Sequence, residues 1–291
     1  MATSTILRAP RLVFTGLSGS LLDHHSYAWQ PAIPWLQRLS RAGVPVIPVT
    51  SKTRAELLAL RLDLGLNEAP FIAENGAVIG LPPSWQHARL DRNPGDIEGL
   101  SIKTLGLDID FLRWRLDILR TRMKVHFRTV GEMTLDEIVA ATELSEPAAR
   151  LARVREGSEP LIWEDSDQAL DAFREVLRND GLRLARGGRF WHVTGDVDKG
   201  RAVRWLTARF VALRGASPWT LGLGDGPNDV PLLDAVDQAV LIRGVHRQPV
   251  DVTHPALYHT RDTGSRGWVE GLDYWLGSEF VDTPSNDEVA R

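Results

Sequence analysis

The sequence predicts an α/β protein in which a doubly wound, mainly parallel sheet carries a second, inserted α+β domain. Short apolar runs alternate with helix-like segments near the N-terminus, the order expected of a parallel sheet with covering helices. This alternation stops near Pro82–Pro83 and resumes from Asp198. At 291 residues the chain is long enough for two domains. We therefore expect a Rossmann-like core formed by 1–81 and 194–291 and an inserted domain formed by 82–193.

Before the interruption, the sequence predicts three strands and two helices. The expected strands are the apolar runs at 12–15, 44–49 and 70–73. The expected helices lie at 30–39 and 53–64, where apolar residues recur at helical spacing and a glycine follows.

The inserted segment has a mixed pattern, and the core pattern resumes after it. In the inserted segment, helices are expected at 110–123, 135–142, 147–155 and 168–179, and strands at 182–185 and 189–193. Beyond it, the expected elements are a helix at 199–213, a strand at 219–222, a short helix after Pro227 and a strand at 239–242. We expect the polar residues 282–291 to fray.

Composition limits the class of partner. Hydrophobic residues make up 43% of the chain and charged residues 25%, which is ordinary for a globular protein. The net charge of −4 is too mild to attract nucleic acid or an anionic membrane, and no apolar run is long enough to cross a bilayer. The chain has no cysteine, and residues 1–8 lack a secretory signal pattern. We therefore expect a cytoplasmic protein with a small-molecule partner.

The first motif with chemical content is Gly222–Asp229, directly after a predicted strand. Its carboxylates Asp225 and Asp229 stand at the carboxyl end of a parallel strand, the edge where such sheets bind ligands. Oxygen ligands of this type suit Mg²⁺. Turns also favour Gly, Asp, Asn and Pro for conformational reasons, and the motif alone does not decide between these interpretations.

Lysine is scarce in this chain, since only four of the 34 basic residues are Lys. Lys199, within Asp196–Gly200, stands at the start of a predicted helix, where the helix dipole disfavours a cation. Its position indicates a nearby anion, either a phosphate or a carboxylate cluster. The alternative is a solvated surface lysine.

A second lysine, Lys52, lies in Val49–Thr53, where a strand ends and a helix begins. Backbone N–H groups and the Thr50 hydroxyl at this point would form a phosphate cradle. The stretch is also a helix N-cap, and the two roles are compatible if Thr53 caps the helix while Thr50 faces a ligand.

Together with Glu74–Ala77 after the third strand, these motifs resemble those of Cof-type haloacid dehalogenase-like (HAD) phosphatases, which carry a large cap inserted after that strand. Within that superfamily the chain is most similar to mannosyl-3-phosphoglycerate phosphatases, through Asp23–Tyr27, Ser51–Thr53 and Gly187–His192. The resemblance implies a HAD-like core with a cap. It also implies Mg²⁺-dependent removal of phosphate from a glycosyl-3-phosphoglycerate, which yields the compatible solute mannosylglycerate.

The resemblance also implies residue roles. Thr50 and Lys199 would be catalytic, and Mg²⁺ would be held by Asp225, Asp229 and the backbone carbonyl of Ser18. The implied substrate-binding residues are Ser20, Ser51, Lys52, Asn75, Arg189, His192 and Asn228.

The first motif departs from the family pattern. Such phosphatases open with Asp-x-Asp-Gly-Thr, whose first Asp attacks phosphorus and whose second is the general acid and base. Here Gly16 and Ser18 stand at these two positions, and Ser20 replaces the Thr. Loss of the nucleophile commonly lowers turnover by roughly 10⁴ to 10⁶, or about 5–8 kcal/mol of barrier. Loss of a charged ligand also lowers the expected affinity for Mg²⁺.

Three hypotheses follow from this departure. The first is a weakly active or inactive homologue that keeps a small phosphorylated, glycosylglycerate-like ligand. The second is an active phosphatase that bypasses the aspartyl intermediate, through water or another carboxylate such as Asp23. The third is a regulatory or scaffold subunit with an empty site and a protein partner.

Other polar residues have simpler explanations beside a functional one. His24 and His25 are adjacent, point in different directions and lack an evident third metal ligand, which favours polar loop residues or neighbours of a substrate. His192, with Arg186 and Arg189 close by, either clamps a charged substrate or is a hinge histidine.

Overall fold

The computed structural model describes residues 9–91, 96–97, 99–244 and 250–280. The expectations for residues 1–8 and 282–291 lie outside this part of the chain.

The core is built on a five-stranded parallel sheet with the order β13-β12-β11-β1-β2. Its strands are β1 (Arg11–Thr15), β2 (Val46–Pro48), β11 (Trp219–Gly224), β12 (Gln238–Leu241) and β13 (Leu257–His259). The order reverses at β1, so the doubly wound architecture predicted from the sequence is confirmed.

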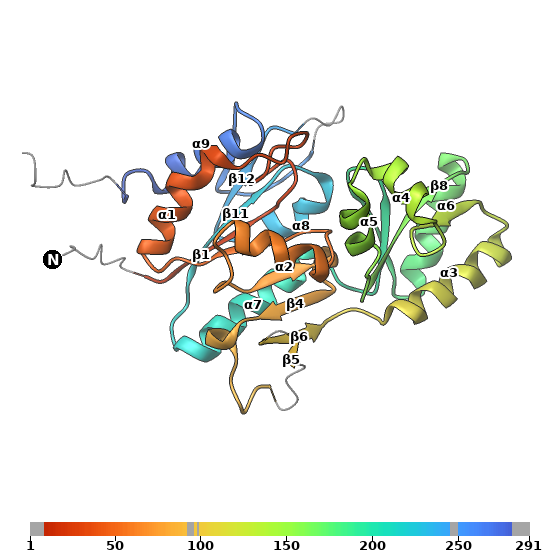
Figure 1. Cartoon of the computed structure of the whole chain (residues 1–291), viewed down its shortest axis with the longest axis horizontal. Coiled ribbons are helices and arrows are strands. Elements are labelled where there is room, and N and C mark those ends of the chain that lie inside the picture. The colour runs from red at the N-terminus through yellow and green to blue at the C-terminus, as the bar shows by residue number, and fades with distance from the viewer. Residues whose placement is uncertain (1–8, 92–95, 98, 245–249, 281–291) are drawn as a thin grey trace, which may run out of the picture.

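Helices cover both faces of this sheet (Figure 1). The core helices are α1 (Ile33–Arg41), α2 (Arg54–Asp63), α7 (Lys199–Arg214), α8 (Val230–Leu233) and α9 (Gly264–Leu276), with short 3₁₀ helices η1 (Gln30–Ala32), η2 (Glu74–Gly76), η3 (Pro83–Trp85) and η4 (Pro227–Asp229). On one face Trp35 of α1 and Trp268 of α9 pack in the same apolar cluster. On the other face Leu206 of α7 and Leu232 of α8 pack together. Alternate residues of β1 supply the two clusters, Val13 to the first and Phe14 to the second.

A second, antiparallel sheet continues the core beyond β2. It has the order β3-β4-β6-β5, with β3 (Phe71–Ala73), β4 (Val78–Leu81), β5 (Asp96–Ile97) and β6 (Leu100–Thr104). Because β6 pairs with β4, and Trp85 is buried in a core cluster, the boundary expected at residue 82 falls inside this part of the fold. The two prolines that suggested a boundary only end β4 and begin η3.

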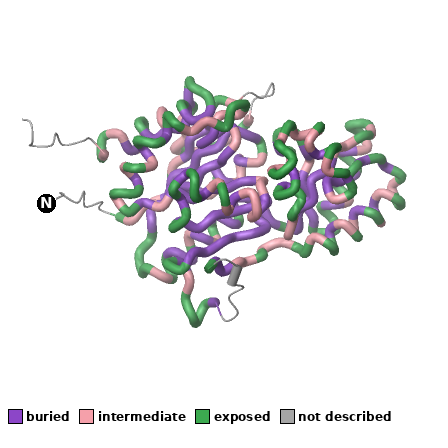
Figure 2. The backbone as a smooth tube through the Cα atoms, viewed as in Figure 1, coloured by how far each residue is buried: buried purple, intermediate pink, exposed green. Residues whose placement is uncertain are grey.

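The inserted region forms a four-stranded antiparallel sheet with helices packed on it (Figures 1 and 2). Its strands, in the order β7-β8-β10-β9, are β7 (Phe127–Thr129), β8 (Ser158–Trp163), β9 (Arg183–Arg186) and β10 (Trp191–Thr194). Its helices are α3 (Ile109–Met123), α4 (Leu135–Thr142), α5 (Glu146–Ala152) and α6 (Asp167–Asn179). Leu116 of α3 and Phe173 of α6 share one apolar cluster with the sheet. No helix in the described part of the chain is long and apolar enough to cross a membrane.

Candidate functional site

Three loops meet at the carboxyl ends of β11, β1 and β2, which are neighbours in the sheet. They enclose a cavity of about 80 Å³. Its lining residues are Ser18, His24, Thr50, Ser51, Gly188, Asp225, Gly226, Asn228 and Asp229. The structure thus brings together six residues that the sequence analysis selected, on the edge of the sheet where parallel α/β proteins bind ligands. The turn between β9 and β10 supplies Gly188, so the inserted region closes one side of the cavity.

Lys199 and Asp229 form a buried ion pair at the base of the site. The Lys199 Nζ lies 2.6 Å from Asp229 Oδ1, and both side chains are only 4% exposed. The other carboxylate oxygen of Asp229 accepts the backbone N–H groups of Asp225 and Gly226, each at 3.1 Å. The anion that the sequence predicted beside Lys199 is therefore present as the carboxylate of Asp229.

Asp225 is the second buried carboxylate, and the Ser20 hydroxyl donates to its Oδ1 at 2.9 Å. Burial, together with the neighbouring charge of Asp229, raises the pKa of Asp225 from an ordinary 3.8 to about 7. Gly19 packs directly against this carboxylate with a φ of +82°, and a Cβ there would lie 2.2 Å from Asp225 Oδ2. Asp225 therefore keeps its proton to a higher pH than an ordinary aspartate does.

The loop after β2 serves both as a helix cap and as part of the cavity. The Thr53 hydroxyl accepts the Glu56 N–H in a capping box that starts α2. Thr50 is 4% exposed, and its Oγ1 accepts the Lys52 N–H at 3.2 Å. The Lys52 ammonium instead pairs with Glu56 at 3.0 Å and does not line the cavity.

Asn75 and Asn228 join the core loops on the other side of the cavity. The Asn228 amide donates to Asn75 Oδ1 at 3.1 Å, while Asn75 Nδ2 is buried and has no partner among the residues that the structure describes. Both residues line a second recess of about 620 Å³, which also contacts Lys199 and the edge strand β9.

Arg189 and His192 lie outside the cavity lining. Arg189 binds Glu143 at 2.6 Å and the Ala141 carbonyl, both in the inserted region. His192 is 5% exposed, and within the described ranges its Nδ1 has no hydrogen-bond partner. Burial lowers the pKa of His192 from 6.5 to about 3, and the positive charges of Arg155, Lys199 and Arg186 add to this effect.

The loop after β1 faces the site without a carboxylate. A Cβ built on Gly16 would lie 2.8 Å from Ser20 Oγ and 3.5 Å from Asp229 Oδ1. Any side chain at position 16 would therefore point into the site, as a nucleophile would need to.

Comparison with known proteins identifies the fold. No family model matches the chain. A haloacid dehalogenase-like hydrolase from B. subtilis superposes with a TM-score of 0.61 at 17% identity, covering 91% of this chain and 99% of that one. A HAD-superfamily phosphatase from Bacteroides thetaiotaomicron gives a TM-score of 0.63 at 16% identity, with 91% and 95% covered. The sucrose-phosphatase of a Synechocystis species, solved with sucrose and phosphate, gives 0.58 at 17% identity, with 91% and 98% covered. The chain has the HAD-like fold.

Magnesium, expected from the family resemblance, does not fit the residues of this HAD-like site. Within the described ranges no group of three or more His, Asp and Glu residues is placed to hold a metal ion. Asp229 is already bound by Lys199 and two backbone N–H groups. The Oδ1 of Asp225 accepts the Ser20 hydroxyl. Position 16 supplies no side-chain oxygen, so the third carboxylate that the family places there is missing.

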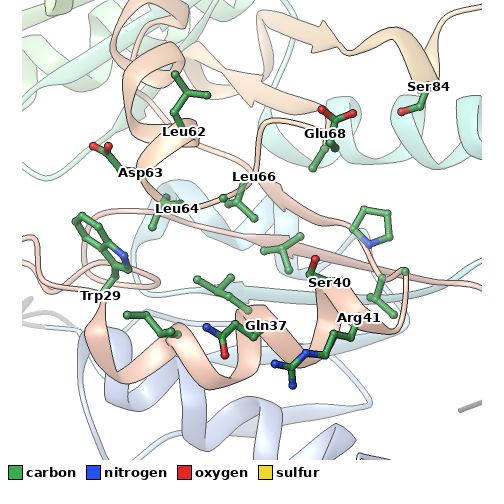
Figure 3. A pocket seen from close by; sticks show the side chains of 18 of the residues that line it. Trp29, Gln37, Ser40, Arg41, Leu62, Asp63, Leu64, Leu66, Glu68 and Ser84 are labelled. Carbon is green, nitrogen blue, oxygen red and sulfur yellow. The ribbon is translucent and has the colours of Figure 1, made fainter. Parts of the chain in front are cut away.

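A wider groove of about 720 Å³ lies at the opposite edge of the HAD-like core (Figure 3). Gln37 and Arg41 of α1 line one side of it, and Leu62 to Leu66 at the end of α2 line the other. The groove contains none of the predicted site residues and lies near the amino end of β2, away from the ligand-binding edge. Its size therefore does not make it the functional site.

Replacing Asp225 by Asn should stabilise the protein above neutral pH. The folded-state pKa of Asp225 is raised, so its contribution to stability is present below about pH 4 and is lost as the pH rises through about 7. The amide side chain has no charge to bury, so the melting temperature of Asp225→Asn should exceed that of the parent at about pH 8, with the difference disappearing near pH 4. Thermal unfolding at both pH values measures this. The exposed Asp136→Asn on α4 is the control, and an equal gain in Asp225→Asn at both pH values would contradict the assignment.

His192→Gln should change the acid side of the stability profile. The folded pKa of His192 lies below its ordinary value, so the parent loses stability as the pH falls from about 6.5 toward 3. Gln does not titrate, and the variant should show a shallower loss by up to about 1.4 kcal/mol per pH unit. Urea unfolding across this range measures the slope. The exposed His259→Gln should keep the slope of the parent, whereas a parent-like slope in His192→Gln would contradict the prediction.

Proposed function

We propose that this chain binds a small phosphorylated ligand in the cavity at the carboxyl edge of its sheet and hydrolyses it slowly or not at all. The observation that carries the proposal is that the residues expected to bind phosphate are in place, while position 16 is a glycine and has no side chain. Thr50, Ser51 and the Lys199–Asp229 pair are in place, while the position that faces them from β1 has no side chain. Covalent phosphoryl transfer to the enzyme needs a nucleophile at that point.

The class of ligand is proposed from three further features. Proteins with this fold include phosphatases, and one of them was solved with sucrose and phosphate. The stretches Asp23–Tyr27, Ser51–Thr53 and Gly187–His192 resemble those of mannosyl-3-phosphoglycerate phosphatases. The recess beyond Asn228 is lined by charged side chains of both signs, among them Arg186 and the ion-paired Arg183 and Asp198, which suits a polar remainder of the ligand. A glycosyl-3-phosphoglycerate or a related sugar phosphate matches this set.

Of these two outcomes, slow hydrolysis is favoured by Asp225. Burial raises the pKa of its carboxyl group, and the protonated form can donate to a leaving oxygen while water attacks phosphorus, the proton released by the water returning to the carboxylate. Without a carboxylate at position 16, Mg²⁺ affinity should be weak, and ligand binding should depend little on it.

Phosphate binding tests the anion site directly. Calorimetry with inorganic phosphate should give a measurable affinity that changes less than about 3-fold between Mg²⁺ and a chelator, because the protein side chains supply the site. Thr50→Val keeps the shape of the side chain but removes its hydroxyl, and should weaken phosphate binding by about 10-fold or more. Thr104→Val, at the exposed end of β6, should bind as the parent does. No phosphate binding by the parent would refute the proposal and favour a scaffold role.

Restoring the missing carboxylates tests the lost chemistry. Gly16→Asp with Ser18→Asp should release phosphate from glycosyl-3-phosphoglycerates at least about 10⁴-fold faster than the parent and should require Mg²⁺. The new Cβ at position 16 approaches Ser20 Oγ to 2.8 Å, so the triple variant that adds Ser20→Ala is assayed beside the double variant. Turnover by the parent at ordinary phosphatase rates would show that the native loop is competent and would overturn the proposal.

A further inference from the structure

We call residues 50–52 the phosphate loop. Each of its three backbone carbonyl groups accepts a hydrogen bond from elsewhere in the protein. In chain order they accept the Asn75 N–H, a guanidinium N–H of Arg155 and the Glu74 N–H, at 2.9, 2.8 and 3.0 Å. In a trans peptide the C=O and the following N–H point to opposite sides. Because the carbonyl groups are held by these contacts, the N–H groups that follow them point away from those contacts, toward the cavity that Thr50 and Ser51 line.

One of these amide groups remains open for a ligand. The Lys52 N–H is taken by Thr50 Oγ1, and the Thr53 N–H by Glu56. The Ser51 N–H has no acceptor within the part of the chain that the structure describes. An anion in the cavity can accept it together with the neighbouring hydroxyls.

Glu74 connects this loop to the inserted region. Its backbone N–H binds Lys52 O, and its side chain, completely buried, accepts four hydrogen bonds from the segment 156–158. The donors are the N–H groups of Glu156, Gly157 and Ser158 and the Ser158 hydroxyl, at 2.8, 3.0, 2.8 and 2.8 Å. A carboxylate with this many donors is held in a single position.

The backbone at this point adopts a conformation that side chains seldom take. Glu74 and Asn75 both have positive φ values, 50° and 55°. Such positions cost free energy and persist where surrounding contacts hold them. The same two residues supply two of the three donors to the phosphate loop and the Asn75–Asn228 contact.

These contacts close a ring through both parts of the molecule. It runs from the phosphate loop to Glu74, from Glu74 to the segment 156–158, and back through the adjacent Arg155 to Ser51 O. We propose that Glu74 is a positioning residue for the phosphate loop: it fastens the segment 156–158 to the core, so that Arg155 and the backbone of Glu74–Asn75 hold the loop's carbonyls away from the ligand. This inference rests on the proposed phosphate-binding function and adds the coupling of that site to the inserted region.

Three variants test whether Glu74 positions the phosphate loop or only attaches the segment 156–158 to the core. Glu74→Gln keeps the size of the side chain but presents an NH₂ group to backbone donors, and it should lower phosphate affinity about 10-fold. Arg155→Met removes the return contact to Ser51, together with local hydrogen bonds to the Ala152 carbonyl and the Ser158 hydroxyl, and leaves the Glu74 side chain intact. It should also weaken phosphate binding, by several fold, with the amides of 156–158 still protected by Glu74. Arg54→Gln breaks a different ion pair across the same interface, with Glu156 at 2.8 Å, and should leave the affinity unchanged.

Hydrogen exchange on the full chain supplies the decisive readout. Coupling is reciprocal, so phosphate should slow exchange at 156–158 in the parent and should lose this effect in Glu74→Gln. A merely structural contact would not respond to phosphate. If Glu74→Gln fails to fold, Arg155→Met decides the question through phosphate affinity.

Parent-like phosphate affinity in both Glu74→Gln and Arg155→Met would overturn the inference while leaving the proposed function standing. If the parent binds no phosphate, the proposed function fails. Hydrogen exchange then decides by itself whether Glu74 positions the phosphate loop. Faster exchange in the phosphate loop of Glu74→Gln would then support the inference, and unchanged exchange there would overturn it.

Discussion

The buried ion pair between Lys199 and Asp229 is the interaction on which the site depends. Both side chains are almost inaccessible to water, so removing either would leave an uncompensated buried charge, a cost of about 3–5 kcal/mol. The pair joins the start of α7 to the loop after β11, and Asp229 in turn holds the N–H groups of Asp225 and Gly226. This arrangement places Asp225 beside a second carboxylate, whose charge adds to the effect of burial in raising the pKa of Asp225.

Much of this site was predictable because its motifs are local in sequence. Asp225 and Asp229 stand in a turn after an apolar strand, and Thr53 followed by Glu56 is a recognisable helix start. Lys52 precedes the N-cap Thr53 and so lies outside α2, and the family resemblance implied that its side chain binds the ligand. Local spacing indicated the loop and the start of the helix, but the ion pair between Lys52 in the loop and Glu56 in the first turn of α2 decides where the Lys52 side chain points.

Contacts between distant segments were not predictable in this way. Glu74 binds amides more than eighty positions further along the chain, and nothing in its local sequence indicates them. Strand β8 was not predicted, because Pro160 interrupts its apolar pattern. The proline pair after β4 suggested a domain boundary, but in the structure it only begins the short helix η3. Arg189 was grouped with the site because it lies near His192 in sequence, but its guanidinium turns to Glu143.

The absence of a carboxylate at position 16 changes the electrostatic requirements of the whole site. The Cβ of an aspartate at position 16 would lie 3.5 Å from Asp229 Oδ1. Three acidic side chains would then face the single ammonium group of Lys199. Like charges at such distances raise one another's pKa values, and a divalent cation is the usual means of neutralising them. With Gly16, one of the two remaining carboxylates is balanced by Lys199, and burial raises the pKa of the other. Under the proposed function, the missing side chain at position 16 therefore accounts both for the absent nucleophile and for a weaker requirement for a metal.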